Sequence, residues 1–225
     1  MKLIIQIPCL NEEDVLPITL SELPEFIEGI DELEVLIVDD GSSDGTKEAI
    51  SMMIEDSIND RAISYSSNRG LGSVYRTGFD EAKGKFVTFF PADGQFPASE
   101  IKDFYKLNLG ADLVLGYLPQ LKRSVVSIIL SKIERLMYKF LLGPMPRFQG
   151  LFMFRREILE RFELVSEGRG WGVVMEFIIR VSRNGGVIKS LPGTTYPRKV
   201  GKSKVNNLET MWSNLKQIFY LRKVL

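Results

Sequence analysis

The stretch EVLIVDDGSSDGT, residues 34–46, contains the features that decide the fold. Its aliphatic start, EVLIV, predicts a buried strand, and GSSDGT supplies the small and polar residues typical of a turn. A helical pattern then runs from Asp44 to Glu55. A strand that leads through a short polar turn into a helix is the repeating unit of an α/β sheet. Taken alone, DDGSSDG is equally consistent with a plain loop whose aspartates cap a helix.

The same alternation runs through the first half of the chain. Strands are expected at LIIQI (3–7), EVLIV (34–38), ISYS (63–66), FVTFF (86–90) and DLVLG (112–116), separated by helical patterns at 12–28, 44–55, 71–82 and 98–109. Asn11 is expected to cap the first of these helices, beginning at Glu12. Strands separated by helices predict parallel pairing with right-handed crossovers. The expected fold class is α/β, a Rossmann-like and mostly parallel central sheet with helices on both faces.

The second half of the chain does not repeat the strand–helix alternation of the first half, and no linker separates the two. We expect a helix at 124–142, a strand at 151–155, a helix at 171–183, a strand at 187–191, a basic loop and a terminal helix. No repeat or low-complexity tract separates the halves, so residues 1–225 are expected to form a single domain.

Composition excludes several classes of function. Basic and acidic residues each total 29, so the chain has no net charge that would attract nucleic acid. No nucleic-acid partner is therefore expected. Histidine is absent, which removes the commonest general base and zinc ligand. The single cysteine, Cys9, allows no internal disulfide and fits a cytoplasmic protein. No segment approaches the roughly 20 apolar residues of a membrane-spanning helix.

Acidic residues follow three of the expected strands. Glu12 follows the first, Asp39 and Asp40 the second, and Asp93 the fourth. Strand ends of an open parallel sheet lie along one crevice, so these side chains are expected to converge on one ligand. Carboxylates there accept hydrogen bonds from a base and from ribose hydroxyls, or bind a divalent cation.

Five segments together resemble a known family. IPCLNEED (7–14), IVDDGSSDGT (37–46), NRGLGSVYRTGFDEAKG (68–84), FFPADGQFP (89–97) and PRKVGKSK (197–204) are similar, in sequence and spacing, to family 2 glycosyltransferases of GT-A fold. Within that family the likeness is to the dolichyl-phosphate mannose synthase and polyprenyl-phosphate glycosyltransferase group. The resemblance implies a nucleotide-sugar-binding half at 1–116 and an acceptor-binding half with amphipathic helices at 117–225.

The resemblance assigns residues to the donor. It implies that the nucleotide sugar is bound by residues at the ends of the first, second and fourth strands: Pro8, Leu10, Glu12, Val38, Asp40, Ala92 and Asp93. The donor's base and sugar stay open, with GDP-mannose and UDP-hexoses as candidates.

The resemblance also implies a metal site. The family's Asp-any-Asp motif aligns with Pro91, Ala92 and Asp93, so a proline replaces the first aspartate. Asp93 and Gln95 are therefore the expected ligands of Mg²⁺ or Mn²⁺, with donor diphosphate oxygens completing the shell.

A basic loop matches the family's Arg-x-x-Gly-x-Ser-Lys pattern through Arg198 and Lys204. These two cations are expected to bind the donor and to stabilise the leaving diphosphate, which makes them, with Asp93, the predicted catalytic residues.

The sequence is consistent with two classes of acceptor, a saccharide or a lipid phosphate. A saccharide hydroxyl needs a general base, for which Glu176 is the candidate, whereas a phosphate monoester is already anionic. Glu176 is otherwise expected to orient the sugar or a loop. Apolar residues recur at helical spacing in 124–142 with basic residues distributed around them, and 205–225 combines aromatic and basic residues. Both patterns predict either helices packed on the sheet or helices in a membrane headgroup layer, with Arg123 binding a lipid phosphate.

The first hypothesis is a metal-assisted, inverting transferase that moves a hexose from a nucleoside diphosphate sugar to a polyprenyl phosphate. It would act peripherally on the cytosolic face of the membrane. The alternatives are the same donor chemistry with a saccharide acceptor, and a non-catalytic nucleotide-sugar or lipid-binding protein.

Overall fold

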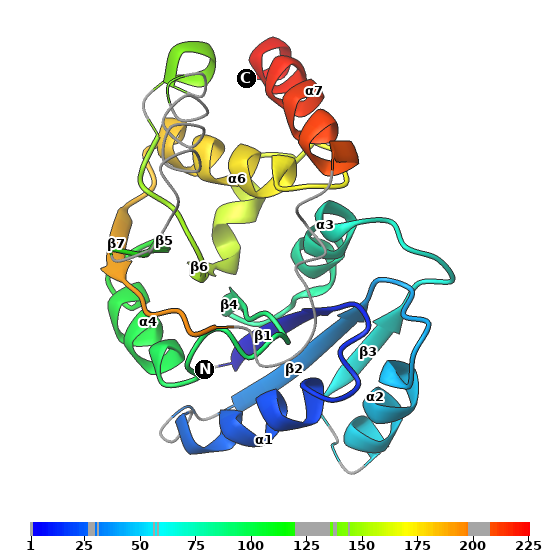
Figure 1. Cartoon of the computed structure of the whole chain (residues 1–225). Coiled ribbons are helices and arrows are strands. Elements are labelled where there is room, and N and C mark those ends of the chain that lie inside the picture. The colour runs from blue at the N-terminus through cyan, green and yellow to red at the C-terminus, as the bar shows by residue number, and fades with distance from the viewer. Residues whose placement is uncertain are drawn as a thin grey trace.

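A seven-stranded sheet in the order β3-β2-β1-β4-β6-β5-β7 forms the centre of the molecule (Figure 1). The computed structural model describes residues 2–26, 30, 32–55, 57, 59–119, 136, 139–143, 145–197 and 208–225, with 24–26 and 208–215 described by their backbone alone. The strands are β1 (Lys2–Cys9), β2 (Glu32–Asp39), β3 (Arg61–Ser64), β4 (Phe86–Phe89), β5 (Leu113–Tyr117), β6 (Phe152–Arg155) and β7 (Ile188–Pro192). Four of the six strand pairings are parallel, which confirms the expected mostly parallel α/β sheet.

Helices cover both faces of this sheet, as the alternation predicted. They are α1 (Leu16–Phe26), α2 (Thr46–Glu55), α3 (Leu71–Glu81), α4 (Glu100–Asn108), the 3₁₀ helix η1 (Arg156–Arg161), α6 (Gly172–Arg183) and α7 (Leu208–Val224). Apolar residues of α1, α2 and α4 join one core cluster, and those of α3 and α6 join the other. No helix among the described residues is long and apolar enough to cross a bilayer.

One strand breaks the parallel pattern. β6 lies antiparallel between β4 and β5, with Phe152 opposite Phe89 and Phe154 opposite Leu113. β7 then extends the sheet in parallel beside β5. The two halves of the sequence therefore contribute strands to one continuous sheet.

The start of α1 differs from expectation. The helix begins at Leu16, and Asn11 does not cap it: this residue has φ 51°. The Asn11 side-chain oxygen instead accepts a hydrogen bond from the main-chain amide of Ser43 at 2.8 Å. The main-chain amide of Asn11 donates to Ser42 Oγ at 2.8 Å. Asparagine tolerates the left-handed region of backbone conformation. Asn11 therefore forms its hydrogen bonds with the loop after β2 instead of capping α1.

The helix predicted at 124–142 lies mostly outside the described residues. Within it the structure describes residue 136 and residues 139–142 as helical. Arg123 also lies outside the described part of the chain. At the other end, α7 occupies most of the predicted terminal helix.

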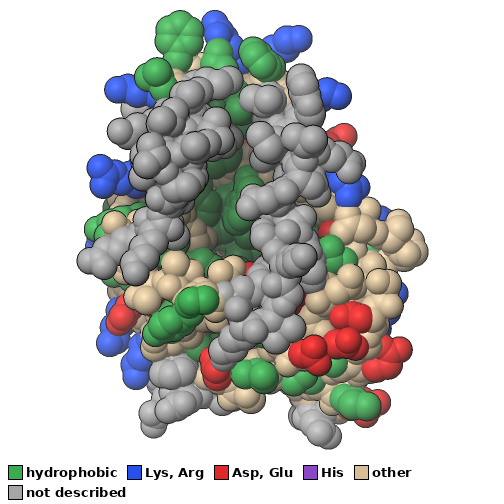
Figure 2. Space-filling model, viewed as in Figure 1, with side chains coloured by type: hydrophobic (Ala, Val, Ile, Leu, Met, Phe, Trp, Pro, Cys, Tyr) green, Lys and Arg blue, Asp and Glu red, His purple; other side chains and the backbone are tan. Residues whose placement is uncertain are grey.

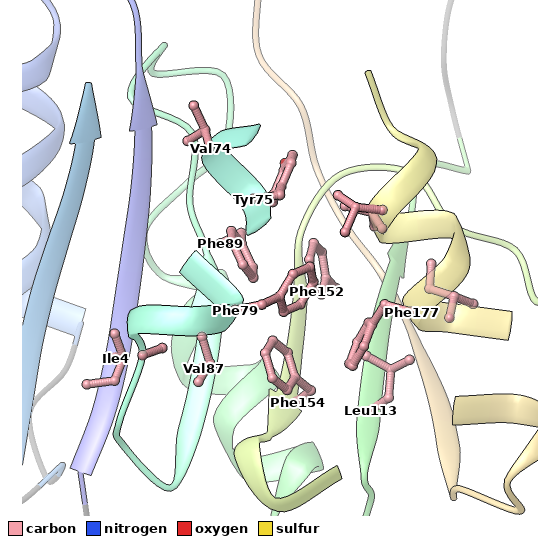
Figure 3. Packing of buried hydrophobic residues seen from close by; sticks show 14 of the residues in the cluster. Ile4, Val74, Tyr75, Phe79, Val87, Phe89, Leu113, Phe152, Phe154 and Phe177 are labelled. Atoms are coloured by element: carbon pink, nitrogen blue, oxygen red, sulfur yellow. The ribbon is translucent and has the colours of Figure 1, made fainter. Parts of the chain in front are cut away.

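Aromatic side chains fill the core between the sheet and the α3–α6 layer (Figure 3). Phe152 on β6 is fully buried, and its ring centre lies 4.8 Å from that of Phe89 and 5.5 Å from that of Phe148. Phe79 and Phe177 approach the same cluster from α3 and α6. Phe152 therefore connects both halves of the fold through one apolar contact network.

We expect Phe152→Ala to lower the free energy of unfolding by about 3–5 kcal/mol, because it removes buried surface and leaves a cavity. Urea denaturation measures the change. Phe140→Ala is the matched control: this phenylalanine is 84% exposed, and its loss should change stability by less than about 0.5 kcal/mol. Equal effects of the two substitutions would contradict this account of the core.

Candidate active site

The carboxyl ends of β1, β2 and β4 meet at one edge of the sheet. Cys9 of β1 pairs in register with Asp39 of β2, and the amide of Asp40 donates to the Cys9 carbonyl at 3.0 Å. On the other side of β1, the Phe90 amide donates to the Gln6 carbonyl at 2.9 Å. The acidic residues after these strands consequently lie along the same edge, as parallel pairing requires.

The loops after β1 and β2 hold each other in place. The Glu12 amide donates to Thr46 Oγ1 at 2.9 Å, and the Gly45 amide donates to Glu13 Oε2 at 2.7 Å. Together with the Asn11 contacts, these bonds satisfy loop amides that have no strand or helix partner. The two loops at the site edge are therefore joined to each other by hydrogen bonds.

Asp39 is fully buried and shapes its own loop. One oxygen, Oδ1, accepts hydrogen bonds from the Ser42 amide at 3.0 Å and from the Ser42 hydroxyl at 2.5 Å. The other, Oδ2, is buried without a hydrogen-bond partner within the described part of the chain. Asp39 thus fixes the turn and keeps one acceptor unused.

Asp40 is bound by the loop between β3 and α3. Its carboxylate accepts from the Arg69 amide at 2.7 Å, the Gly70 amide at 3.0 Å and Asn68 Nδ2 at 2.9 Å, and only 4% of the residue is exposed. Burial raises the pKa of Asp40, although the main-chain amides of Arg69 and Gly70 and the charge of Arg169 act in the opposite direction. A bound base or ribose would have to share this carboxylate with the loop or displace the loop from it.

The second half of the chain reaches the same loop through Arg169. Its guanidinium donates to the Asn68 carbonyl at 3.3 Å and to Asn68 Oδ1, and its own carbonyl accepts from the Gly72 amide at 2.9 Å. Asn68 and Arg169 were not predicted as site residues. The only sequence signal was the Asn-Arg-Gly turn before α3, because nothing in the sequence indicates which distant segment packs on it.

Asp93 lies in the turn after β4. The Gln95 amide donates to Asp93 Oδ1 at 3.2 Å, and Thr19 of α1 donates to the Ala92 carbonyl at 3.1 Å. Burial, and then the nearby negative charge of Asp93, raise the pKa of Tyr75. Tyr75 is therefore a neighbour of Asp93 that the sequence did not reveal.

The donor set at this turn fits part of a metal site. Asp93 offers a partly buried carboxylate, and Gln95 uses its amide nitrogen in a hydrogen bond to the Tyr196 carbonyl. That bond leaves the Gln95 side-chain oxygen as an acceptor. Among the described residues no three acidic, cysteine or histidine side chains come together, so a cation here would need oxygens from a ligand or water.

Residues 193–197 pass directly beside this turn. The Tyr196 amide donates to the Gln95 carbonyl at 2.8 Å, and the Gln95 side chain donates back to the Tyr196 carbonyl at 3.2 Å. The Thr194 amide donates to the Glu100 carboxylate, and burial raises the pKa of Glu100. The chain that leads to the basic loop is thereby attached to the Asp93 turn.

The remaining predicted donor residues differ in what they offer. Pro8 and Leu10 are partly buried around the end of β1, and Glu12 is almost fully buried beside them. The side chains of Val38 and Ala92 are buried, and the Ala92 carbonyl already accepts the hydrogen bond from Thr19. Arg198 and Lys204 lie outside the described residues.

Glu176 anchors a loop. It is fully buried, and its carboxylate accepts from the Val165 amide at 3.0 Å, the Ser166 amide at 2.7 Å and Arg180 Nε at 2.7 Å. From α3, Arg76 donates to the carbonyls of the same loop. A carboxylate held by these donors is poorly placed to receive a proton from an acceptor, and the arrangement favours the loop-orienting interpretation.

Glu176→Gln should lower the free energy of unfolding by about 3 kcal/mol, because it leaves Arg180 without its buried counter-ion and sets an amide group against main-chain donors. Chemical denaturation at neutral pH measures this change.

A matched ion pair provides the control. Arg156 and Glu160 are also four positions apart, with Arg156 Nη1 3.0 Å from Glu160 Oε1, but Glu160 is exposed and Arg156 is only partly buried. Glu160→Gln should change stability by no more than about 1 kcal/mol. A stable Glu176→Gln protein that loses only turnover would indicate a catalytic base instead of an anchor.

Comparison with known proteins places these features in context. A model of glycosyl transferase family 2 matches residues 4–162. A polyprenol monophosphomannose synthase from Mycolicibacterium smegmatis is 28% identical over 231 residues, covering 95% of this chain and 83% of the relative. An undecaprenyl-phosphate mannosyltransferase from Micrococcus luteus is 27% identical over 219 residues, covering 92% and 88%.

A solved structure has a similar fold. The mannosyltransferase of Pyrobaculum calidifontis, in complex with GDP-Man and Mn²⁺, superposes with a TM-score of 0.66 at 20% identity, covering 97% of this chain and 63% of that one. This likeness confirms the GT-A type of α/β fold.

Proposed function

Because the chain belongs to glycosyl transferase family 2 and is a glycosyltransferase, we propose that it transfers a hexose from a nucleoside diphosphate sugar to a polyprenyl or dolichyl phosphate. The two relatives whose names specify polyprenyl acceptors support the choice of acceptor. The half at 1–116 would bind the donor, and the half at 117–225 would bind the acceptor.

One observation carries the proposal. The paired hydrogen bonds between Gln95 and Tyr196 attach the chain two residues before Arg198 to the turn that holds Asp93. A donor diphosphate needs positive charge on both sides as its bond to the sugar breaks. This attachment supports a shared diphosphate site between the Asp93 turn and the basic loop.

Asp93 and the side-chain oxygen of Gln95 would hold Mg²⁺ or Mn²⁺ there. A divalent cation neutralises diphosphate charge and stabilises the leaving group. Since the Pro91 side chain supplies no ligand, this chain would hold the cation with one carboxylate and would rely more heavily on the donor's oxygens. The Mn²⁺ in the Pyrobaculum structure is consistent with a divalent metal in this fold.

The reaction would be a single displacement with inversion. An oxygen of the acceptor phosphate attacks the anomeric carbon while the bond from that carbon to the diphosphate oxygen breaks, and the nucleoside diphosphate leaves. Arg198 and Lys204 would stabilise the charge on the departing diphosphate more strongly in the transition state than in the ground state. Because a phosphate monoester is already anionic near neutral pH, no general base is required.

A phosphate acceptor needs no general base, and this agrees with the role of Glu176, whose carboxylate is held by loop amides and Arg180. A saccharide acceptor would need a carboxylate with free access to a hydroxyl, whereas Glu176 is fully buried and held by three donors. The acceptor phosphate would instead be gripped by Arg123. A lipid acceptor would bring the protein to the cytosolic face of a membrane as a peripheral enzyme, through segments 124–142 and 205–225.

Asp93→Ala should reduce kcat by about 100-fold or more, because it removes the only protein carboxylate proposed for the cation. Purified protein is incubated with Mn²⁺, polyprenyl phosphate and radiolabelled GDP-mannose or UDP-glucose, and label in the organic phase is counted. Chelation of the metal should abolish the same signal. Asp103→Ala removes an exposed carboxylate of α4 and should leave turnover within about twofold.

The same assay separates the alternatives. Label in a water-soluble saccharide would replace the lipid acceptor with a sugar acceptor. Donor binding without transfer to either product would favour the non-catalytic alternative. Unchanged turnover of Asp93→Ala would overturn the metal assignment for every acceptor.

A further inference from the structure

The last three turns of α7 have two distinct sides. Ile218 and Leu221 are almost fully buried against Leu142 and Ile179. The opposite side of the helix carries Lys216, Phe219, Tyr220 and Lys223, which we call the α7 outer face. Each lysine lies three residues from one of the two aromatic residues and four from the other, so all four share one side. All four are exposed, Phe219 at 55% and Tyr220 at 41%.

A neighbouring segment extends this face. Residues 139–142 are helical, with Leu142 packed in the same cluster as Ile218. Lys139 is exposed, and Phe140 is 84% exposed. Figure 2 shows hydrophobic and basic side chains together at the end of the molecule where Figure 1 places the end of α7.

One arginine connects the two segments. Arg183, at the end of α6, donates to the main-chain oxygen of Leu225 at 2.5 Å and to that of Leu142 at 2.9 Å. Leu142 lies in the last turn of its helical segment and Leu225 directly follows α7, so neither carbonyl has an intrahelical donor. The guanidinium therefore holds the ends of α7 and of residues 139–142 beside each other.

The composition of this surface indicates its partner. Neither 136–143 nor 216–225 contains an acidic residue, so every charged side chain described there is basic. Exposed aromatic rings beside lysines and arginines are typical of the interface between water and lipid, where the rings enter the headgroup layer and the cations meet anionic lipids. A second copy of the chain fits poorly, because a symmetric contact through this face would oppose lysines to lysines.

We propose that the α7 outer face, together with Lys139 and Phe140, binds the headgroup layer of membranes that contain anionic lipids. The inference rests on the proposed function in one respect, since a lipid acceptor would be met at such a surface. Beyond the proposed function, the inference specifies anionic headgroups as the partner and the α7 outer face, with Lys139 and Phe140, as the surface that binds them. Binding requires neither donor nor acceptor.

The test is co-sedimentation of the full chain with vesicles that lack polyprenyl phosphate. Vesicles of phosphatidylcholine alone are compared with vesicles of phosphatidylcholine and phosphatidylglycerol at about two to one, at low and high salt. We expect binding to the anionic vesicles, weakened by salt, and at least about tenfold weaker binding to neutral ones.

Two substitutions locate the surface. Lys216→Gln with Lys223→Gln should weaken binding to anionic vesicles by about tenfold or more, because each basic residue at such a surface contributes about a fivefold change in partitioning. Phe219→Ser should weaken binding in both salt conditions. Lys102→Gln with Lys106→Gln, the same charge change on the exposed side of α4, should leave binding unchanged. Circular dichroism confirms that each variant is folded.

Three results would overturn the inference: no binding to either vesicle, equal loss for the α4 control pair, or self-association through α7 without vesicle binding. Transfer to a short-chain polyprenyl phosphate in detergent is measured in parallel. Failure of vesicle binding with intact transfer in detergent would remove the membrane surface and leave the proposed function standing. Intact vesicle binding without transfer would contradict the proposed function and leave the membrane surface standing.

Discussion

Parallel pairing of β1 with β2 on one side and β4 on the other is the constraint on which the rest of the site depends. Parallel strands finish at the same edge, so the loops that follow them must share one small region. Their amides then lack ladder partners, and side chains such as Asn11, Ser42 and Thr46 supply them. The polar residues at this edge consequently support one another before any ligand arrives.

The two halves of the chain are joined at three places around this edge. Phe152 brings a strand of the second half into the core, and Arg169 binds the loop that holds Asp40. Gln95 and Tyr196 exchange hydrogen bonds beside Asp93. The segments proposed to bind donor and acceptor are therefore connected by direct contacts, and a transferase needs such a connection in order to align two substrates.

Buried carboxylates in this protein serve structure as much as chemistry. Asp39, Asp40 and Glu176 each accept hydrogen bonds from main-chain amides, and each thereby fixes a loop. An acidic residue after a strand is consequently an ambiguous signal. What distinguishes Asp93 is that it is only partly buried and lies beside the segment that leads to the basic loop.

The sequence by itself determined the α/β class, most element positions and the family, because periodicity, turn residues and motif spacing are local properties. It did not determine that β6 would run antiparallel between β4 and β5, since pairing partners are chosen by core packing across the whole chain. It misplaced Asn11 as a helix cap, because the competing Ser43 amide is 32 residues away. Only the tertiary structure decided that Glu176 faces main-chain donors and that Tyr196 meets Gln95, since both contacts depend on how distant segments fold back on the sheet.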